Sequence, residues 1–394
     1  MKQLITIALL VPFLSFSQTA ETDKGIRFEH LAFSELLAKA KKENKMIFID
    51  AYTTWCGPCK WMVKNVFPND TAAAYYNKNF INAKIDMEKG EGIGLAKKYQ
   101  VSCYPTYLFI DGNGQLIHRT SSAMPVKEFV QLGTTAMDPA KQFSAFQKKY
   151  NSGGMSPEEM GEFVLMKSRS CLPAKEETAK YFSTQSEADL TSKKNWEIFF
   201  TSDININSRE FKYLIEHRVE YEKTFDPKMV NSVIESSYYR ALQQFVKVKD
   251  TDGYKKLKFE ILEKAFSFSE QMVLSADIDF FEATEDWTDY AQSAVKFIDK
   301  YGKDDYNRLN NMAWGFYEHV TDRAMLLKAE EWSKRSVELN PGYFNYDTYA
   351  AVLVKLGKKT EALAAAEMAI ELAKKSGDDY KETSLMLEKI KALK

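Results

Sequence analysis

The segment from Met46 to Lys60 constrains the fold of this chain more than any other part of the sequence. Residues 46–52 form a continuous apolar run interrupted only by Asp50, which is typical of a central strand buried on both faces. Trp55-Cys56-Gly57-Pro58-Cys59-Lys60 follows and opens a helix predicted over 59–66. The spacing predicts an α/β domain with a cysteine pair at the N-terminus of a helix.

The residues on either side complete one domain, predicted over 18–137. The hairpin signal Asp111-Gly112-Asn113-Gly114 separates two short strands. The alternation of apolar runs and amphipathic stretches predicts a mixed sheet between helices. The expected strands cover 26–28, 46–52, 80–85, 106–110 and 115–119, and the expected helices cover 30–42, 59–66, 92–99 and 125–132.

Beyond Asp138-Pro139 the strand signals stop, and the pattern predicts an all-α domain over 138–394. Near 310–375, two helix pairs carry small residues at matching positions, with the spacing of tetratricopeptide repeats. Small residues there let paired helices approach closely. Ordinary helical hairpins are the alternative interpretation. No acid–base or metal constellation occurs in this region, and a repeat array is suited to holding another polypeptide, so we expect a protein partner.

Charge and the N-terminal residues limit the partners and the location. The 54 Lys and Arg residues nearly balance the 55 Asp and Glu residues, which argues against nucleic acid as a partner. Lys2, the apolar run over 4–16 and the small residues Ser15 and Ser17 predict a signal peptide at 1–17 and export, most simply to a periplasm. A membrane anchor is the alternative, but a span needs about 20 apolar residues. No later segment is apolar enough to span a membrane, so none is expected after cleavage.

The four cysteines are at positions 56, 59, 103 and 171, too few for a disulfide-stapled scaffold. At a helix N-terminus, unpaired N–H groups and the helix dipole favour a Cys56 thiolate. Cys59, one turn later, can attack the mixed disulfide that Cys56 forms. Zinc binding usually needs a second Cys pair or histidines at ligand spacing, and a purely structural disulfide is the other alternative. The pattern predicts redox exchange with no metal and no cofactor.

Residues 25–137 resemble the thioredoxin superfamily through Asp50, the Trp55–Lys60 motif, Lys84 and Tyr104-Pro105-Thr106. The resemblance is closest to the periplasmic branch that includes the C-terminal domain of thiol:disulfide interchange proteins. It implies a thioredoxin-like fold and thiol–disulfide exchange with protein substrates.

The resemblance also implies a role for each site residue. Cys56 would be the nucleophile, Cys59 the resolving thiol and Asp50 the acceptor of the Cys59 proton. Burial raises the pKa of such a carboxyl towards that of a useful base. Lys84 would be the charge partner of Asp50, although an exposed lysine at a strand end is the alternative. The resemblance further assigns a cis peptide to Pro105, which would face the cysteines, and substrate contacts to Trp55, Gly57, Pro58 and the backbone of Tyr104.

The sequence departs from the family pattern at three places. Lys64 stands where a helix-kinking proline is often found, and residues 119–125 lack the glycine that commonly lines the substrate groove. Cys103, two residues before Pro105, is unusual. It is interpreted as a regulatory thiol, as a buried free cysteine, or as the partner of Cys171 in a disulfide.

These observations predict an extracytoplasmic thiol–disulfide oxidoreductase that works in the reducing direction and is recharged by an upstream redox partner. The alternative is an interaction scaffold, in which the helical repeats and the thioredoxin-like unit bind partners without turnover. A Cys-Gly-Pro-Cys pair above a buried Asp50 favours the enzyme, because binding alone requires neither feature.

Overall fold

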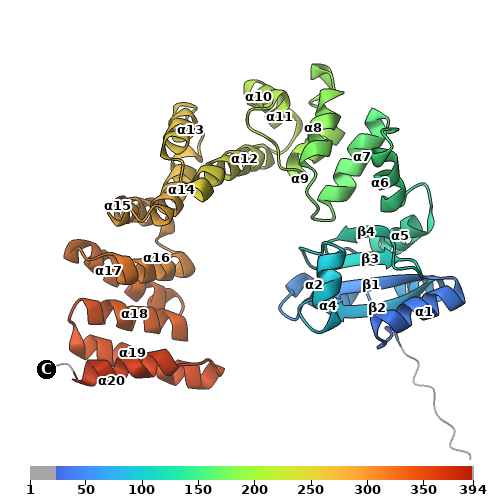
Figure 1. Cartoon of the computed structure of the whole chain (residues 1–394). Helices are drawn as coiled ribbons and strands as arrows, with labels where there is room; N and C mark the ends of the chain where they lie inside the picture. The colour runs from blue at the N-terminus through green and yellow to red at the C-terminus, as the bar shows by residue number, and fades with distance from the viewer. Residues whose placement is uncertain (1–23, 393–394) are drawn as a thin grey trace, which may run out of the picture. The chain divides into compact units, whose positions relative to one another are not determined.

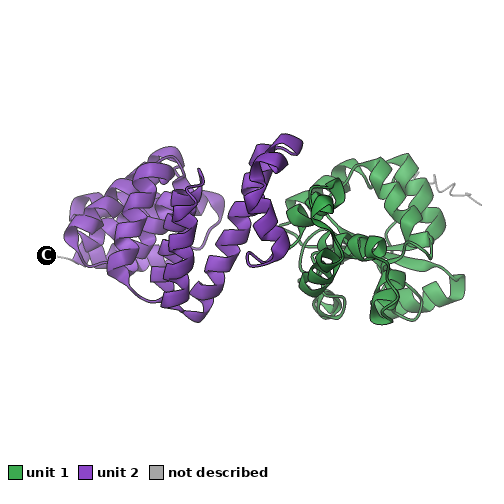
Figure 2. Cartoon of the chain, turned by 90° about the horizontal axis from the view of Figure 1, so that it is seen from above, with its two compact units in different colours: residues 1–203 green, residues 204–394 purple. Residues whose placement is uncertain are grey.

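The computed structural model describes residues 24–392, so the predicted signal peptide lies outside the described residues. The chain divides into two compact units, Met1–Asp203 and Ile204–Lys394, which Figure 2 distinguishes by colour. Each unit has its own hydrophobic cores and is described separately below.

The first unit is built on a four-stranded sheet with the strand order β2-β1-β3-β4. β1 pairs in parallel with β2 and antiparallel with β3, which in turn pairs antiparallel with β4. This confirms the mixed sheet expected from the sequence. The strands are β1 (Met46–Tyr52), β2 (Phe80–Asp86), β3 (Thr106–Ile110) and β4 (Leu116–Ser121).

Helices cover both faces of this sheet (Figure 1). One core joins alternate residues of β1 and β3, such as Phe48 and Phe109, to α2, α3 and α5. The other joins the intervening residues, such as Ile47 and Ile49, to α1 and α4. This alternation follows from the two-residue period of a strand. The helices are α1 (Phe33–Glu43), α2 (Gly57–Asn65), α3 (Asp70–Asn79), α4 (Glu91–Lys98) and α5 (Val126–Met137).

Two elements differ in kind from the sequence-based expectation, and α5 continues to Met137, beyond its predicted end at 132. In place of a strand over 26–28, a single bridge pairs Glu29 with Ala83 of β2. Helix α3 was not predicted, although Asn69 caps it by accepting hydrogen bonds from the backbone N–H groups of Thr71 and Ala72.

Four further helices belong to the first unit and extend beyond the predicted boundary at 137/138. In Figure 1, α6 and α7 lie beside β4 and α5. The backbone N–H of Phe143, the first residue of α6, donates to Nδ1 of the buried His118 in β4 (3.2 Å). The compact units therefore divide at 203/204, and the boundary at 137/138 stays a prediction about independent folding. These helices are α6 (Phe143–Asn151), α7 (Pro157–Ser168), α8 (Lys175–Ser183) and α9 (Lys193–Thr201).

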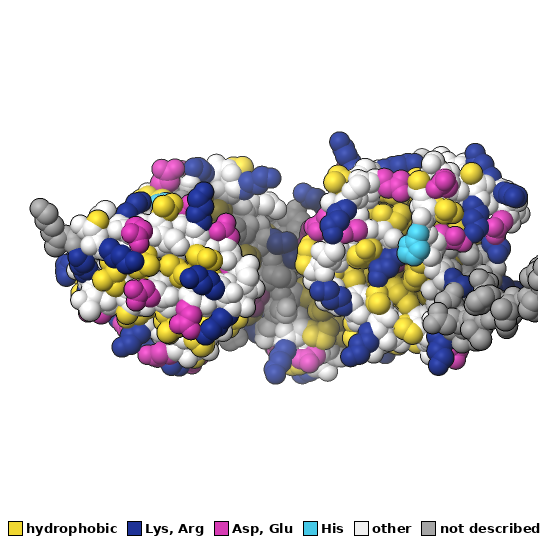
Figure 3. All heavy atoms as spheres, turned by 90° about the horizontal axis from the view of Figure 1, so that it is seen from below, with side chains coloured by type: hydrophobic (Ala, Val, Ile, Leu, Met, Phe, Trp, Pro, Cys, Tyr) yellow, Lys and Arg dark blue, Asp and Glu magenta, His cyan; other side chains and the backbone are white. Residues whose placement is uncertain are grey.

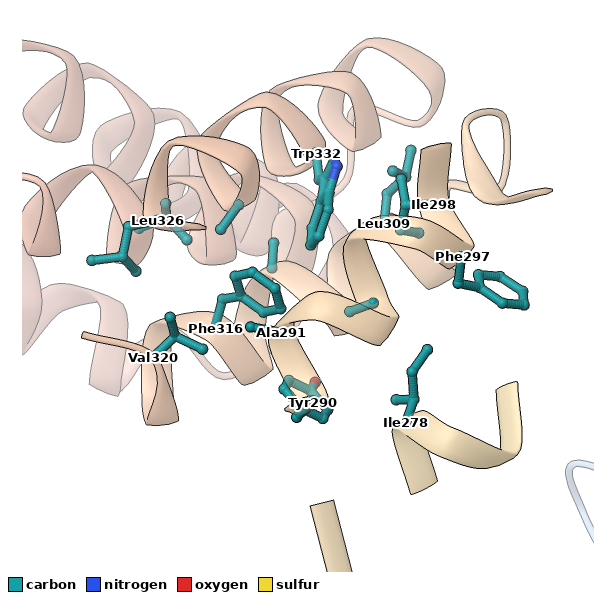
Figure 4. Packing of buried hydrophobic residues seen from close by; sticks show 14 of the residues in the cluster. Ile278, Tyr290, Ala291, Phe297, Ile298, Leu309, Phe316, Val320, Leu326 and Trp332 are labelled. Atoms are coloured by element: carbon teal, nitrogen blue, oxygen red, sulfur yellow. The ribbon is translucent and has the colours of Figure 1, made fainter. Parts of the chain in front are cut away.

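The described part of the second unit is helical throughout, which confirms the all-α expectation for this part of the chain. A large core joins α14 to α18, and Figure 4 shows Phe316 and Trp332 packed within it. The helices are α10 (Arg209–Glu216), α11 (Arg218–Thr224), α12 (Pro227–Val248), α13 (Thr251–Glu263), α14 (Ser269–Ala283), α15 (Trp287–Phe297), α16 (Tyr306–His319), α17 (Arg323–Leu339), α18 (Tyr343–Lys355), α19 (Lys359–Ser376) and α20 (Lys381–Ala392).

The surface carries both signs of charge side by side. On the face drawn in Figure 3, Lys and Arg side chains lie among Asp and Glu side chains and are not gathered by sign. Among the helices within 24–392, none is both long enough and apolar enough to cross a membrane.

Candidate active site

Cys56 and Cys59 form a disulfide at the N-terminus of α2, with their Cα atoms 5.3 Å apart. Cys56 is the N-cap of α2, and its Sγ accepts a hydrogen bond from the Cys59 backbone N–H (3.0 Å). Both cysteines are 2% exposed in this oxidised state, so exposure does not distinguish their roles. Their positions differ, because Cys56 is the N-cap residue and its sulfur accepts a first-turn backbone N–H, as a thiolate there would.

Asp50 lies on the sheet face that α2 covers. Strand residues two apart share a face, so Asp50 shares the face of Phe48, which packs with Met62 of α2 in one core. Met62 and Cys59 are the buried residues of α2. Asp50 therefore lies beneath the same helix face as the second cysteine.

The Asp50 carboxylate is buried without compensation by hydrogen bonds. It is 1% exposed, and neither oxygen accepts a hydrogen bond from a described residue. Burial raises the pKa of Asp50 from 3.8 to about 7, and the nearby Lys84 charge opposes part of that rise. A carboxyl with a pKa near neutrality can both accept and release a proton at physiological pH.

Lys84 is the register partner of Asp50 on β2, and its Nζ lies 3.9 Å from Asp50 Oδ2. The ammonium group also lies 4.6 Å from the centre of the Tyr52 ring. Its side chain is 26% exposed, so the cation reaches from solvent to the buried carboxylate. On the other side, Tyr107 of β3 is paired with Asp50, and burial together with the Asp50 charge raises the pKa of Tyr107.

Trp55 and Tyr104 form an aromatic surface next to the disulfide. Their rings meet edge to face with centroids 6.0 Å apart. Trp55 is 65% exposed, and its Nε1–H donates to both carboxylate oxygens of Glu88 (3.0 Å each). Gly57 and Pro58 are exposed between the two cysteines. Sequence reasoning did not identify Glu88, whose only signal was its place in the loop after β2.

The Tyr104–Pro105 peptide bond is cis. Pro105 is buried at the start of β3, and its carbonyl oxygen accepts a hydrogen bond from the Ser122 backbone N–H (3.1 Å). The turn that carries Tyr104 is thereby held to the end of β4.

Cys103 is bonded to Cys171, with the two Cα atoms 6.3 Å apart. The interpretation of Cys103 as a buried free cysteine is therefore wrong for this oxidised state, and the disulfide left open by the sequence is present. Pairing between residues 68 positions apart depends on tertiary structure, which the sequence pattern does not specify.

Within residues 24–392, no cluster of three or more His, Cys, Asp or Glu side chains has the arrangement of a metal site. The chemistry that the arrangement supports is that of two adjacent sulfurs at a helix N-terminus above a carboxyl of raised pKa. A mixed sheet that presents such a pair defines the class of thioredoxin-fold thiol–disulfide exchange proteins.

Comparison with known proteins places the chain within this class. Residues 33–136 match the family model described as a thioredoxin-like domain. Thioredoxin Y1, chloroplastic, from Arabidopsis thaliana is 31% identical over 123 residues, which cover 31% of this chain and 67% of that protein. The chain belongs to the thioredoxin family through this domain, and thioredoxins are thiol–disulfide oxidoreductases.

Two further similarities cover a comparable share of the chain. Thioredoxin Y, chloroplastic, from Oryza sativa subsp. japonica is 34% identical over 110 residues, and the chain spans 60% of its length. The match covers 28% of this chain. The solution structure of a putative disulphide-isomerase from Bacteroides thetaiotaomicron is 44% identical and covers 29% of this chain and 95% of its own, with a TM-score of 0.28.

Proposed function

We propose that the protein is an extracytoplasmic thiol–disulfide oxidoreductase that reduces disulfides in protein substrates. The observation that carries the proposal is the buried Asp50, which has a pKa of about 7 and lies under the helix that begins at the Cys56–Cys59 disulfide. A buried carboxylate without hydrogen bonds costs folding free energy, and a binding scaffold gains nothing from it. An exchange enzyme gains a proton acceptor beneath its resolving thiol.

In the first step, the Cys56 thiolate of the reduced protein attacks one sulfur of the substrate disulfide. A bond forms between Cys56 Sγ and that sulfur, the substrate S–S bond breaks, and the second substrate sulfur leaves as a thiolate. The N–H groups at the start of α2 stabilise the attacking thiolate. In the reverse of this step, when the substrate thiolate attacks the substrate sulfur of the mixed disulfide, the same N–H groups make Cys56 a good leaving group.

In the second step, Asp50 accepts the Cys59 proton, and the resulting thiolate attacks Cys56 Sγ. The Cys56–Cys59 bond forms, the mixed disulfide breaks, and the first substrate sulfur leaves as a thiolate. Two electrons have then moved from the Cys56–Cys59 pair to the substrate. An upstream dithiol returns them before the next turnover.

The substrate surface is assigned to Trp55, Gly57, Pro58 and the backbone of Tyr104, next to Pro105. The exposed edge of Trp55 and the exposed Gly57-Pro58 turn support this assignment. Lys84 is assigned as the charge partner that limits the rise of the Asp50 pKa. The predicted signal peptide supports export, most simply to a periplasm.

The helical region is proposed to hold a protein partner. α16 with α17 and α18 with α19 are consecutive helix pairs of tetratricopeptide-like length that pack against each other. Small residues of these helices, including Ala313, Ala329 and Ala362, are completely buried at the contacts. Stacked pairs of this kind present an extended surface suited to another polypeptide.

Single-turnover reduction of a protein disulfide by the full-length protein tests the role of Asp50. In Asp50→Asn, resolution of the mixed disulfide should slow about 100-fold or more near pH 7, and the rate should lose its inflection near pH 7. Lys64→Gln, an exposed change on the same helix, is the matched control and should leave the profile unchanged. An Asp50→Asn profile that matches the wild type would remove the proton acceptor from the mechanism.

The reduction potential of the Cys56–Cys59 pair tests the direction. A reductant should equilibrate near about −270 mV, whereas a value near about −120 mV is that of an oxidant. The measurement uses redox buffers with the full-length protein and reads the pair by alkylation and mass spectrometry. A potential at the oxidising end would reverse the proposed direction without affecting the exchange reaction itself.

A further inference from the structure

The loop between α7 and α8, residues 169–174, is fastened to the turn that precedes β3. We call this segment the α7–α8 loop. The disulfide between Cys171 of this loop and Cys103 forms the covalent part of the attachment. Cys103 is two residues before Pro105, so the attachment is made next to the turn that carries Tyr104.

Hydrogen bonds reinforce the disulfide from both sides. Ser102 Oγ donates to the Cys171 carbonyl oxygen (3.1 Å). The Arg119 guanidinium donates to the carbonyl oxygens of Tyr99 (2.6 Å), Gln100 (3.2 Å) and Ser170 (3.2 Å). Arg119 is 3% exposed, and burial lowers its pKa to about 10, so the guanidinium stays charged at neutral pH. The buried Arg119 guanidinium therefore joins residues 99–100 to the α7–α8 loop next to the Cys103–Cys171 disulfide.

The same loop lies along the end of β4. The Ser121 backbone N–H donates to the Arg169 carbonyl oxygen (2.9 Å), and Ser121 Oγ donates to the same oxygen. The neighbouring Ser122 N–H donates to the Pro105 carbonyl oxygen (3.1 Å). Residues 121–122 are thus held between Pro105 on one side and the α7–α8 loop on the other. They belong to the 119–125 segment that lacks the groove glycine.

Some residues of the α7–α8 loop are exposed to solvent, although the loop is attached to the rest of the unit. Arg169, Cys171 and Pro173 are exposed, whereas Ser170 between them is completely buried. Alternate burial of this kind anchors the loop through one residue and leaves its neighbours accessible. Through Cys171 this exposed surface is bonded to Cys103, the residue before Tyr104.

We propose that the Cys103–Cys171 disulfide positions the Tyr104–Pro105 turn against the α7–α8 loop, and that this loop is a specificity-determining surface for polypeptide substrates. The proposal rests on the proposed thiol–disulfide exchange at Cys56. It assigns Cys103 and Cys171 as positioning residues, because neither contacts the reacting sulfurs of Cys56 and Cys59. The substrate class is a disulfide within a polypeptide long enough to contact both the turn and the loop.

Steady-state kinetics of the full-length double variant Cys103→Ser/Cys171→Ser test the proposal. The KM for a protein disulfide, such as that of insulin, should rise about fivefold or more with kcat within about twofold, the signature of lost substrate binding. The rate with oxidised glutathione should stay within about twofold of the wild type. Glu197→Gln, which removes the ion pair with the Arg169 side chain and leaves the disulfide intact, is the matched control and should change neither.

Amide hydrogen exchange of the same proteins with Cys56 and Cys59 oxidised gives a readout that does not depend on activity. Amide exchange at residues 99–104 and 169–172 should be faster in the double variant, and elsewhere unchanged. If the serine pair does not fold, Cys103→Ala/Cys171→Val replaces it.

An unchanged KM for insulin, an equal loss with both substrates, or unchanged amide exchange in the two segments would each overturn the proposal. Failure of the wild-type protein to reduce either substrate would instead contradict the proposed function. In that case amide hydrogen exchange still decides whether the Cys103–Cys171 disulfide holds the Tyr104–Pro105 turn.

Discussion

At the residue scale, Asp50 is where function and stability conflict. Its carboxyl group is 1% exposed, and its nearest cation is 3.9 Å away on Lys84. That separation is longer than an ordinary charge-assisted hydrogen bond, so the lysine offsets only part of the burial. The folded protein therefore holds the Asp50 proton up to a pH near 7, whereas the unfolded chain releases it near pH 4.

Asp50→Asn should stabilise the oxidised protein in a pH-dependent way. Because the folded-state pKa is raised, stability is retained below pH 3.8 and lost as the pH rises towards 7. The pKa difference corresponds to about 4 kcal/mol, so the variant should gain about that much at pH 8 and less than about 1 kcal/mol at pH 4. Denaturant unfolding at the two pH values measures the gain. Equal gains at both would show that burial does not raise the Asp50 pKa.

The sequence predicted the individual groups of the site better than the bonds between distant residues. The Cys56–Cys59 pair and Asp50 were predicted because motif and strand lie within ten residues of one another. Glu88, which accepts from Trp55 Nε1, and Arg119, which joins two loops, were missed. Their partners are brought close only by the fold, and a charged residue in isolation reads as a solvated one.

At the element scale, the attachment of α6 to β4 depends on a neutral histidine. His118 Nδ1 accepts the Phe143 backbone N–H, so the imidazole proton is on Nε2. Burial lowers the pKa of His118 to about 4. Protonation of His118 Nδ1 would turn this acceptor into a donor that faces the Phe143 N–H, and the hydrogen bond would be lost.

Stability should therefore fall on acidification through this group. A lowered histidine pKa means that the unfolded chain binds the proton first, so stability is lost as the pH falls from 6.5 to 4. The expected loss is about 3 kcal/mol. In His118→Gln, which keeps an acceptor without a titration, the loss between pH 7 and pH 4 should be smaller by about that amount in denaturant unfolding. A loss equal to that of the wild type would contradict the role of His118.

The close approach of α15 and α16 depends on Gly315. A Cβ at this position would lie 2.3 Å from Oη of the buried Tyr290. Gly315→Ala should therefore destabilise the protein by about 1–3 kcal/mol, measured by denaturant unfolding, because the packed aromatic ring has to shift. Gly94→Ala in α4, where a Cβ meets no atom within 4 Å, is the control. Gly94→Ala should leave the stability of the protein unchanged or raise it by up to about 1 kcal/mol. Equal losses of stability in the two variants would contradict close packing at Gly315.

Elements were predictable where their local pattern was strong. β1 and β3 match their predicted ranges, because buried strands read as continuous apolar runs. α3 was missed, although its Asn69 cap and buried Ala72 and Tyr76 carried a helical signal. The expected strand over 26–28 reduces to one bridge, since strand pairing depends on neighbours that a local pattern does not contain.

At the scale of the whole molecule, the divide at 203/204 separates the helices fastened to the sheet from those with cores of their own. The sequence change at Asp138 marks the end of strand signals and not the end of the first compact unit. α6 and the α7–α8 loop are joined to the sheet and to the turn before β3 by His118, Arg119 and the Cys103–Cys171 disulfide, and α8 and α9 pack on α7.

A fragment of residues 204–394 should fold alone, with a strongly helical circular dichroism spectrum and a cooperative thermal transition, since its cores lie within it. The longer fragment 138–394 should show the same transition, but protease should cleave it first within 138–203, where the contacts to β4 are missing. An unfolded 204–394 fragment would contradict the division into units.

The most direct test of the account traps the first covalent intermediate on the full-length protein. Cys59→Ser is reduced, desalted and mixed with a protein disulfide, and the disulfide-linked peptides are mapped by mass spectrometry. We expect the substrate to be linked to Cys56, since Cys59 is absent and cannot resolve the mixed disulfide. No adduct, or an adduct at Cys103 or Cys171 in place of Cys56, would contradict it.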